Sequence, residues 1–250
     1  MPSSVLTRSR GAILLGVFAV FLATSPAASA QTTCQGRVAT IVGTAGDNFL
    51  TGSPGNDVIA GLGGNDVING GLGNDVICGD TGIDRVSGGP GSDLLSGGLG
   101  IDRLTGNEGD DRLIGDRGDD ELVGGGGRDR LYGGDGKDIL NGGDDSDLLD
   151  GGTDGDTILG RDGADDIFGG EGADVIKGGS DGDRAFGGGD RDRIRGGRGN
   201  DHLWGGGDPD RLFGGAGNDS LDGGFARDRC DGGSGRQDSA VSCEVRIRIP

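Results

Sequence analysis

The chain has 250 residues, of which 62 are glycine; only 31% are hydrophobic and 4% are aromatic. Soluble globular domains are close to half apolar, so a conventional close-packed core is not expected. The formal net charge of −19 disfavours nucleic acid and anionic membranes as partners and favours cations.

Residues 1–30 have the pattern of an export signal. Arg8 and Arg10 precede an apolar run from Gly11 to Ala23, and Ala28-Ser29-Ala30 matches a small-x-small cleavage site. A membrane anchor is the alternative, but the thirteen residues of this run are too few to span a bilayer comfortably. The sequence therefore predicts a secreted, extracellular protein without a membrane span.

Nine-residue units follow one another without insertion or deletion from Gly43 to Asp231, which gives twenty-one tandem repeats. The first residue of every unit is Gly. The sixth is Asp in every unit except the first, which has Asn48, and the eighth is aliphatic except at Ala185 and Cys230. The consensus is G-G-x-G-x-D-x-U-x, where U is aliphatic, and a period this regular argues against low-complexity disorder.

Each unit predicts one tight turn and one short strand. Glycine at the first, second and fourth positions is expected to adopt positive φ in the turn. The last three residues alternate, so the eighth faces a core and its neighbours face outward. Two units make a coil of eighteen residues, whose strands pair in parallel at about 4.8 Å. The predicted fold is all-β, a parallel β-roll (β-solenoid) with a thin core between two sheets.

In such a coil each residue lies above the residue eighteen positions later, so the sixth-position aspartates form ladders. Repulsion between like charges this close is on the order of several kcal/mol each, which calls for counter-ions. Carboxylates together with turn carbonyls are hard oxygen ligands that suit Ca²⁺ better than Mg²⁺, whereas the alternative is a solvated acidic face. The candidate metal ligands are Asp57, Asp66, Asp75, Asp84, Asp93, Asp102, Asp111, Asp120, Asp129, Asp138, Asp147, Asp156, Asp165, Asp174, Asp183, Asp192, Asp201, Asp210, Asp219 and Asp228.

Three units, GSPGNDVIA at 52–60, GGLGNDVIC at 70–78 and GGAGNDSLD at 214–222, closely resemble the RTX, or haemolysin-type, calcium-binding nonapeptide repeat. The resemblance covers residues 43–231. It implies multiple Ca²⁺ ions, each between two stacked turns and held by sixth-position aspartates and turn carbonyls of both. The fourth position departs from Gly in several units, which have Asp145, Asp154, Asp181, Asp190 and Asp208; aspartate tolerates the left-handed region better than most residues.

Residues 31–42 and 232–250 are expected to cap the two ends of the roll. The stretch 232–240 begins as a repeat but has Gln237 at the sixth position. Four cysteines in an exported chain indicate disulfides rather than a zinc site. Three connectivities are possible, and the pairing of Cys34 with Cys78 and of Cys230 with Cys243 is favoured because it would fasten each end of the stack.

Two columns of outward residues stand apart from the repeat. Phe168, Phe186 and Trp204 are eighteen residues apart at ninth positions, where they either stack on one another or form a ladder that binds a ligand. Arg193, Arg211 and Arg229 form a column at seventh positions of the opposite sheet. These arginines are expected to offset neighbouring acidic residues, with a specific anion site as the alternative.

No pattern typical of catalysis is found, because the carboxylates recur as repeated ligands rather than as a unique pair in a cleft. The sequence therefore predicts a secreted, non-enzymatic calcium-binding protein whose β-roll folds on binding extracellular Ca²⁺, with a structural role at a cell surface or in a matrix. The alternative is a calcium-scaffolded adhesin or carbohydrate-binding module that uses the aromatic column. Expected partners are calcium ions, and a cell-surface polymer or a second copy of the chain.

Overall fold

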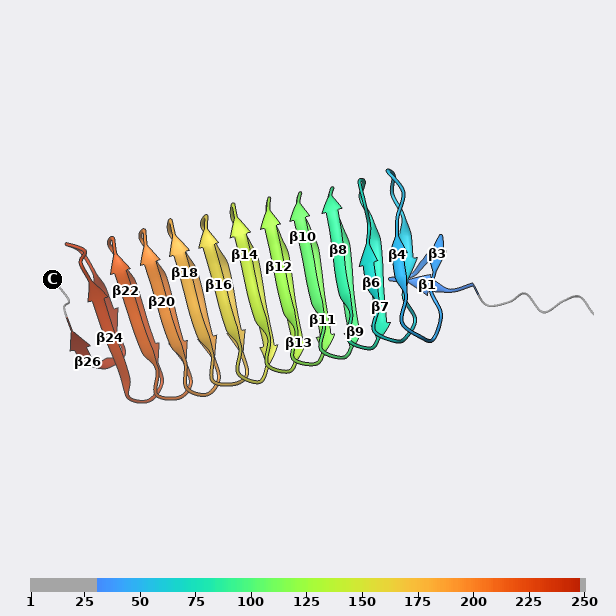
Figure 1. Cartoon of the computed structure of the whole chain (residues 1–250). Coiled ribbons are helices and arrows are strands. Elements are labelled where there is room, and N and C mark those ends of the chain that lie inside the picture. The colour runs from blue at the N-terminus through green and yellow to red at the C-terminus, as the bar shows by residue number, and fades with distance from the viewer. Residues whose placement is uncertain (1–30, 248–250) are drawn as a thin grey trace, which may run out of the picture. The chain divides into compact units, whose positions relative to one another are not determined.

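The structure, a computed structural model, describes residues 31–247. The predicted export signal, residues 1–30, lies outside the described residues. From residue 31 onward the chain winds into a parallel β-solenoid, in which successive strands alternate between two facing sheets (Figure 1). Among residues 31–247, no helix is long and apolar enough to cross a membrane.

Each of the two sheets contains twelve strands. One sheet consists of β4 (Phe49–Thr51), β6 (Val67–Asn69), β8 (Arg85–Pro90), β10 (Arg103–Glu108), β12 (Glu121–Gly126), β14 (Ile139–Asp144), β16 (Thr157–Asp162), β18 (Val175–Ser180), β20 (Arg193–Arg198), β22 (Arg211–Ala216), β24 (Asp228–Gly233) and β26 (Cys243–Ile247). The other consists of β3 (Ile41–Val42), β5 (Val58–Ala60), β7 (Val76–Thr81), β9 (Leu94–Leu99), β11 (Arg112–Arg117), β13 (Arg130–Asp135), β15 (Leu148–Thr153), β17 (Asp166–Gly170), β19 (Arg184–Gly188), β21 (His202–Gly206), β23 (Ser220–Gly224) and β25 (Ser239–Val241). An antiparallel pair, β1 (Thr33–Cys34) and β2 (Arg37–Val38), precedes both sheets.

Strands pair in parallel at the predicted spacing of eighteen residues. Leu104 is the partner of Leu122, which is in turn the partner of Leu140. Most strands are five or six residues long instead of the three predicted. They are longer because the first residues of the next unit continue the ladder, as Asn107 does opposite Gly125. The turn of each unit is thereby restricted to its fourth, fifth and sixth positions.

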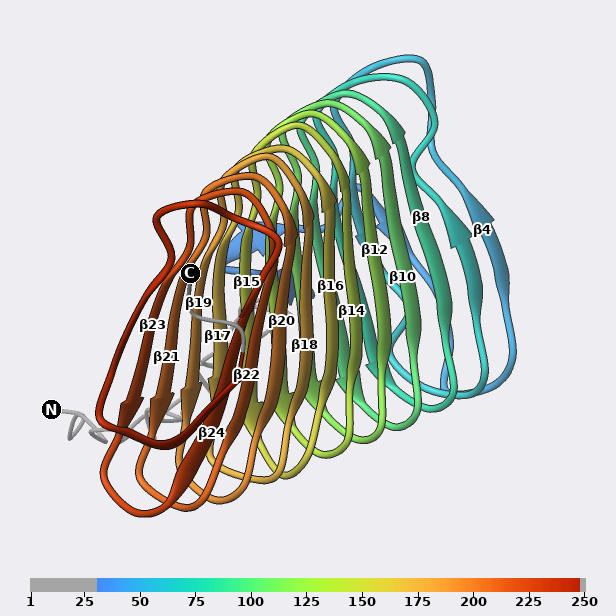
Figure 2. The ribbon, with the colours of Figure 1, turned by 90° about the vertical axis from the view of Figure 1, so that its left-hand side faces the viewer.

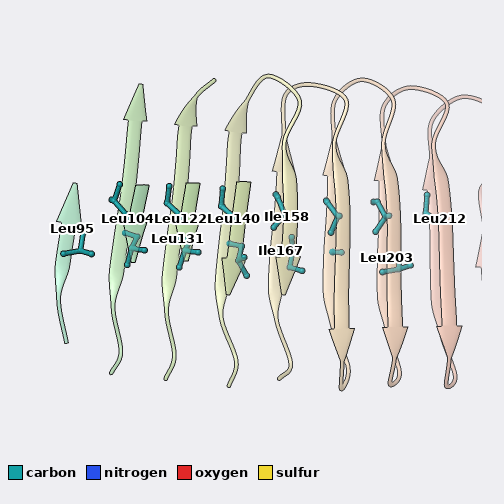
Figure 3. Packing of buried hydrophobic residues seen from close by; sticks show 14 of the residues in the cluster. Leu95, Leu104, Leu122, Leu131, Leu140, Ile158, Ile167, Leu203 and Leu212 are labelled. Atoms are coloured by element: carbon teal, nitrogen blue, oxygen red, sulfur yellow. The ribbon is translucent and has the colours of Figure 1, made fainter. Parts of the chain in front are cut away.

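The core is formed by the eighth-position side chains, which point into the space between the sheets from both sides (Figure 3). Leu95, Leu104, Leu131 and Ile167, for example, are completely buried. Burying such a side chain contributes about 1.5–3 kcal/mol, and each strand supplies one. This thin core leaves little stabilising free energy to offset any charge that the fold also buries.

First-position glycines have a different role from the one predicted. The second and fourth positions adopt positive φ, as at Gly98 (109°) and Gly100 (145°), but the first-position Gly97 and Gly106 do not. A Cβ atom added to Gly106 would lie 2.7 Å from the carbonyl oxygen of Gly124 and 2.9 Å from Cγ of Asp111. Glycine is therefore required at the first position because the neighbouring coil and the aspartate of its own unit leave no space.

Both disulfides join elements near the ends of the roll, in the pairing favoured from the sequence. Cys34 is bonded to Cys78, which connects β1 to β7, and Cys230 is bonded to Cys243, which connects β24 to β26. The Cα atoms of the two pairs are 5.7 and 5.9 Å apart, within the usual range for disulfides.

Candidate calcium sites

The sixth-position aspartates are buried within the turns. From Asp66 to Asp228 none is more than 4% exposed, and Asp57 at the N-terminal end is 9% exposed. A solvated acidic face, the alternative considered from the sequence, therefore does not describe these side chains. They form two ladders of residues eighteen positions apart. The ladders follow the two edges where the chain passes from one sheet to the other, and Figure 2 shows these edges.

From Asp66 onward, one oxygen of each carboxylate fastens consecutive coils together. Oδ1 of Asp84 accepts a hydrogen bond from the backbone N–H of Asp66 at 2.7 Å, and Oδ1 of Asp129 accepts one from Asp111 at 2.8 Å. The same bond recurs along both ladders. It extends to the first unit, where the backbone N–H of Asn48 donates to Oδ1 of Asp66 at 2.7 Å. This repeated bond explains why the sixth position is fixed in register with the turn.

The other oxygen, Oδ2, has no hydrogen-bond partner in most units. This is true of the buried Oδ2 atoms of Asp66, Asp75, Asp84, Asp93, Asp102, Asp111, Asp120, Asp129, Asp138, Asp147, Asp156, Asp165, Asp174, Asp183, Asp192, Asp201, Asp210, Asp219, Asp228 and Asp238. Asp57 differs, because its Oδ2 accepts hydrogen bonds from the backbone N–H and Oγ of Ser53 at 2.6 and 2.9 Å. A buried carboxylate oxygen without a partner costs several kcal/mol, so each of these groups requires a cation or a proton.

Backbone carbonyls lie close to consecutive turns and could complete a cation site. The carbonyl oxygen of Gly82 lies directly against Gly100 in the next coil, and that of Gly100 lies against Gly118 in the same way. Among residues 31–247, no three His, Cys, Asp or Glu side chains converge on one point. A metal ion would therefore need backbone carbonyls in addition to the aspartates. Such an all-oxygen donor set fits Ca²⁺.

The family model described as the RTX calcium-binding nonapeptide repeat matches much of the described chain. The matched stretches are residues 42–77, 51–86, 70–104, 87–122, 114–149, 141–176, 150–185, 177–212 and 204–236. The chain belongs to this family. No curated protein matches the sequence. Membership of the RTX family supports binding of Ca²⁺, and the buried Oδ2 atoms are the feature of this structure that such an ion would satisfy.

Asp238 belongs to the RTX ladder but was missed by the sequence analysis. Its Oδ1 accepts a hydrogen bond from the backbone N–H of Asp219 at 3.0 Å, across nineteen residues instead of eighteen. One additional residue in this last unit moves Gln237 out of the sixth position and brings in Asp238. The sequence contained a signal for Asp238. In the repeat units the core residue follows the ladder aspartate by two positions, and Ala240, which is buried in the core, follows Asp238 by two positions.

Aspartates at the fourth position do not disturb the RTX turns. Asp145, Asp154, Asp181 and Asp190 all adopt positive φ, between 64° and 71°. Asp208 does not, because the proline that follows it disfavours that geometry. The next sixth-position aspartate still bonds to the ladder in this unit as in the others.

Burial raises the pKa of most ladder aspartates above the usual 3.8. The pKa of Asp147 and of Asp183 rises to about 8, and that of Asp102 and of Asp156 to about 7. Neighbouring aspartates raise these values further, whereas the backbone hydrogen bond to Oδ1 lowers them without offsetting burial. Without a metal ion, the fold therefore favours the protonated carboxylic acids.

These pKa shifts predict opposite effects of acid in the absence and presence of calcium. In chelator the folded state holds protons that the unfolded state has lost, so its stability increases as pH falls from about 8 towards about 4.5. With calcium bound, protons compete for the same carboxylates, so acidification over that range should release Ca²⁺. Circular dichroism of residues 31–250 in chelator and ion release measured with a calcium electrode test the two signs. A calcium-free chain that loses β-structure on acidification would contradict this account.

The aromatic column stacks on itself. The ring centroids of Phe168 and Phe186 are 5.1 Å apart, those of Phe186 and Trp204 are 4.3 Å apart, and both pairs are parallel to within 3°. The rings lie on β17, β19 and β21 of one sheet. Their faces are thus largely occupied by one another, which stabilises neighbouring strands and leaves mainly ring edges for a ligand.

Arg193, Arg211 and Arg229 line one groove together with Asp231, but they make no direct ion pair with it. The ion pairs among residues 31–247 involve other basic residues, for example Arg103 with Glu121 at 3.0 Å and Arg184 with Asp166 at 3.3 Å. The three arginines form no ion pair with a described carboxylate.

Proposed function

We propose that this protein is a secreted, non-enzymatic calcium-binding protein whose β-roll folds when it binds multiple extracellular Ca²⁺ ions. The observation that carries the proposal is the buried, unpartnered Oδ2 atom repeated in successive units from Asp66 to Asp228. The thin aliphatic core cannot offset that many uncompensated buried charges. Ca²⁺ held by the ladder aspartates and turn carbonyls would supply the missing partner, as membership of the RTX family supports.

In this proposal residues 1–30 direct export, residues 43–231 bind calcium, and residues 31–42 and 232–250 cap the ends. Extracellular calcium modules typically have dissociation constants of about 10⁻⁴–10⁻³ M, so the chain would stay unfolded inside the cell and fold outside it. The non-enzymatic reading is supported by the ladder itself. Its carboxylates share one environment, and none is distinguished as a catalytic acid or base would be.

The biological role would be structural, at a cell surface or in a matrix. An adhesin that uses Phe168, Phe186 and Trp204 as its ligand platform has less support, because these rings stack on one another.

Circular dichroism of residues 31–250 during a Ca²⁺ titration, with Mg²⁺ as the control, tests the proposal. The expected result is a steep, calcium-specific transition from coil to β-structure, because many weak sites fill while the coils stack cooperatively. At neutral pH, a chain that is fully folded in chelator would overturn the proposal, as would an equal response to Mg²⁺.

A further inference from the structure

The outward surface of β16, β18, β20, β22 and β24 is basic, although the whole chain is strongly acidic. These strands lie side by side in one sheet (Figure 2). Two outward carboxylates, those of Asp162 and Asp231, lie on the same strands. Seven exposed basic residues of these strands are together called the basic face: Arg161, Lys177, Arg193, Arg195, Arg198, Arg211 and Arg229.

The seven basic residues of the basic face outnumber the two outward carboxylates of the same strands, those of Asp162 and Asp231. No residue of the basic face forms an ion pair with a carboxylate among residues 31–247. Arg161 donates a hydrogen bond from Nε to Oδ1 of Asn141 at 2.9 Å, and the guanidinium of Arg195 lies 5.0 Å from the ring centroid of Phe213. These contacts hold two of the side chains in place without cancelling their charge.

Two adjoining grooves run over this face. The larger, with a volume of about 730 Å³, is lined by four basic residues, Arg161, Lys177, Arg195 and Arg198, and by one carboxylate, that of Asp162. Its floor includes Gly179, Gly197, Gly215 and Gly233. The second, of about 450 Å³, is lined by Arg193, Arg195, Arg211 and Arg229 and by one carboxylate, that of Asp231. Arg195 and Phe213 line both grooves, so the two grooves adjoin.

The basic charge is a property of these units and not of the repeat. At the N-terminal end of the same sheet, equivalent positions form a groove of about 530 Å³ that no basic residue lines. Its lining includes Pro54, Leu72 and Pro90, and one carboxylate, that of Glu108. The same backbone therefore carries a groove without basic residues in one part and a basic surface in another.

We infer that the basic face binds an acidic polysaccharide, a carboxylate-bearing sugar polymer lying along the axis of the roll. The five strands extend over about 19 Å at the usual strand spacing, and the column of Arg193, Arg211 and Arg229 presents one guanidinium per coil. Guanidinium groups pair with carboxylates through two parallel hydrogen bonds. The glycine floor leaves space for an extended chain between the charged walls.

Other anionic partners fit this surface less well. Single-stranded nucleic acid binds by stacking its bases on aromatic faces, but Phe213 is the one aromatic residue lining either groove and Arg195 covers its ring. A broad anionic membrane would also meet the acidic remainder of the chain, because the net charge of the whole sequence is −19. A second copy of the chain would have to present three carboxylates in consecutive coils to pair with the arginine column. Among residues 31–247, outward residues eighteen positions apart include at most two carboxylates in succession, as at Asp144 and Asp162.

The test measures the binding of a fluorescein-labelled, size-defined hyaluronan fragment to residues 31–250 in saturating calcium, by fluorescence anisotropy. The test variant is Arg193→Thr/Arg211→Thr/Arg229→Thr, because threonine already occupies the equivalent position at Thr157. The control variant, Arg85→Thr/Arg112→Thr/Arg130→Thr, makes the same charge change at exposed seventh positions outside the grooves. We expect salt-sensitive binding that the test variant weakens at least about tenfold and the control at most about twofold.

Equal losses in the two variants would overturn the inference, and so would equal binding of neutral dextran or no binding of hyaluronan by the folded protein. If sedimentation velocity instead shows a dimer that only the test variant abolishes, without hyaluronan binding, the occupant is a second copy and the inference is wrong. The inference depends on one part of the proposed function, namely that calcium folds the roll. Circular dichroism of the same samples separates the two, because a roll that folds with calcium but ignores hyaluronan contradicts the inference alone.

Discussion

Replacing three consecutive ladder aspartates, Asp111→Asn, Asp129→Asn and Asp147→Asn, is expected to change calcium-dependent and calcium-free folding in opposite directions. The Asn side-chain oxygen can still accept the hydrogen bond from the preceding coil, as Oδ1 does in the native ladder. The charge that would hold Ca²⁺ is lost, so fewer ions should bind and the calcium midpoint of folding should rise at least about tenfold. In chelator, the native chain must either bury these three carboxylates as charges or bind protons to them, and the neutral Asn side chains require neither. The variant should therefore be more folded than the native chain at neutral pH.

A matched control changes three exposed third-position residues, Asp144→Asn, Asp162→Asn and Glu171→Gln, and thus removes the same net charge. Isothermal titration calorimetry gives the number of bound ions, and circular dichroism gives the folding midpoint. If the ladder variant and the control lose the same number of ions, the sixth-position aspartates are not the ligands. If the ladder variant is less folded than the native chain in chelator, burial of charge is not what opposes folding.

The period of the sequence predicted most of the fold because a solenoid is built from local rules. Each unit contacts the units nine and eighteen residues away, so one consensus determines strand direction, register and core for every coil. The pairing of Leu104 with Leu122 and the burial of the eighth positions followed from it. The disulfides were favoured by the same reasoning, since only a pairing local to each end fastens that end.

Features that depend on distances between coils could not be read from the sequence. The two oxygens of a ladder carboxylate have different surroundings, because the coil separation puts Oδ1 against a backbone N–H and leaves Oδ2 enclosed. A single inserted residue concealed Asp238, since a strict period places Gln237 in the turn. The failure of Arg193, Arg211 and Arg229 to pair with carboxylates likewise depends on which side chains lie within reach on the sheet.

The first-position glycine provides the second large effect, in a comparison of two residues on the same strand. Gly124 and Gly126 both belong to β12, and neither has positive φ, so alanine has no backbone strain at either position. A Cβ atom on Gly124 would lie 2.6 Å from the carbonyl oxygen of Gly142 and 2.9 Å from Cγ of Asp129, whereas one on Gly126 would meet nothing closer than 4.0 Å. Gly124→Ala must therefore displace either the next coil or the ladder carboxylate.

We expect Gly124→Ala to destabilise the calcium-loaded roll by about 1–3 kcal/mol, as overpacking of a closely packed interior does. It should also raise the calcium midpoint, because the methyl group displaces the carboxylate of Asp129. Gly126→Ala should be neutral or slightly stabilising, since alanine restricts the unfolded chain without a clash in the folded one. Thermal unfolding at fixed calcium and a calcium titration of both variants provide the comparison. Equal effects at the two positions would mean that the close approach between coils is not what requires glycine, and that the role assigned here to the first position is wrong.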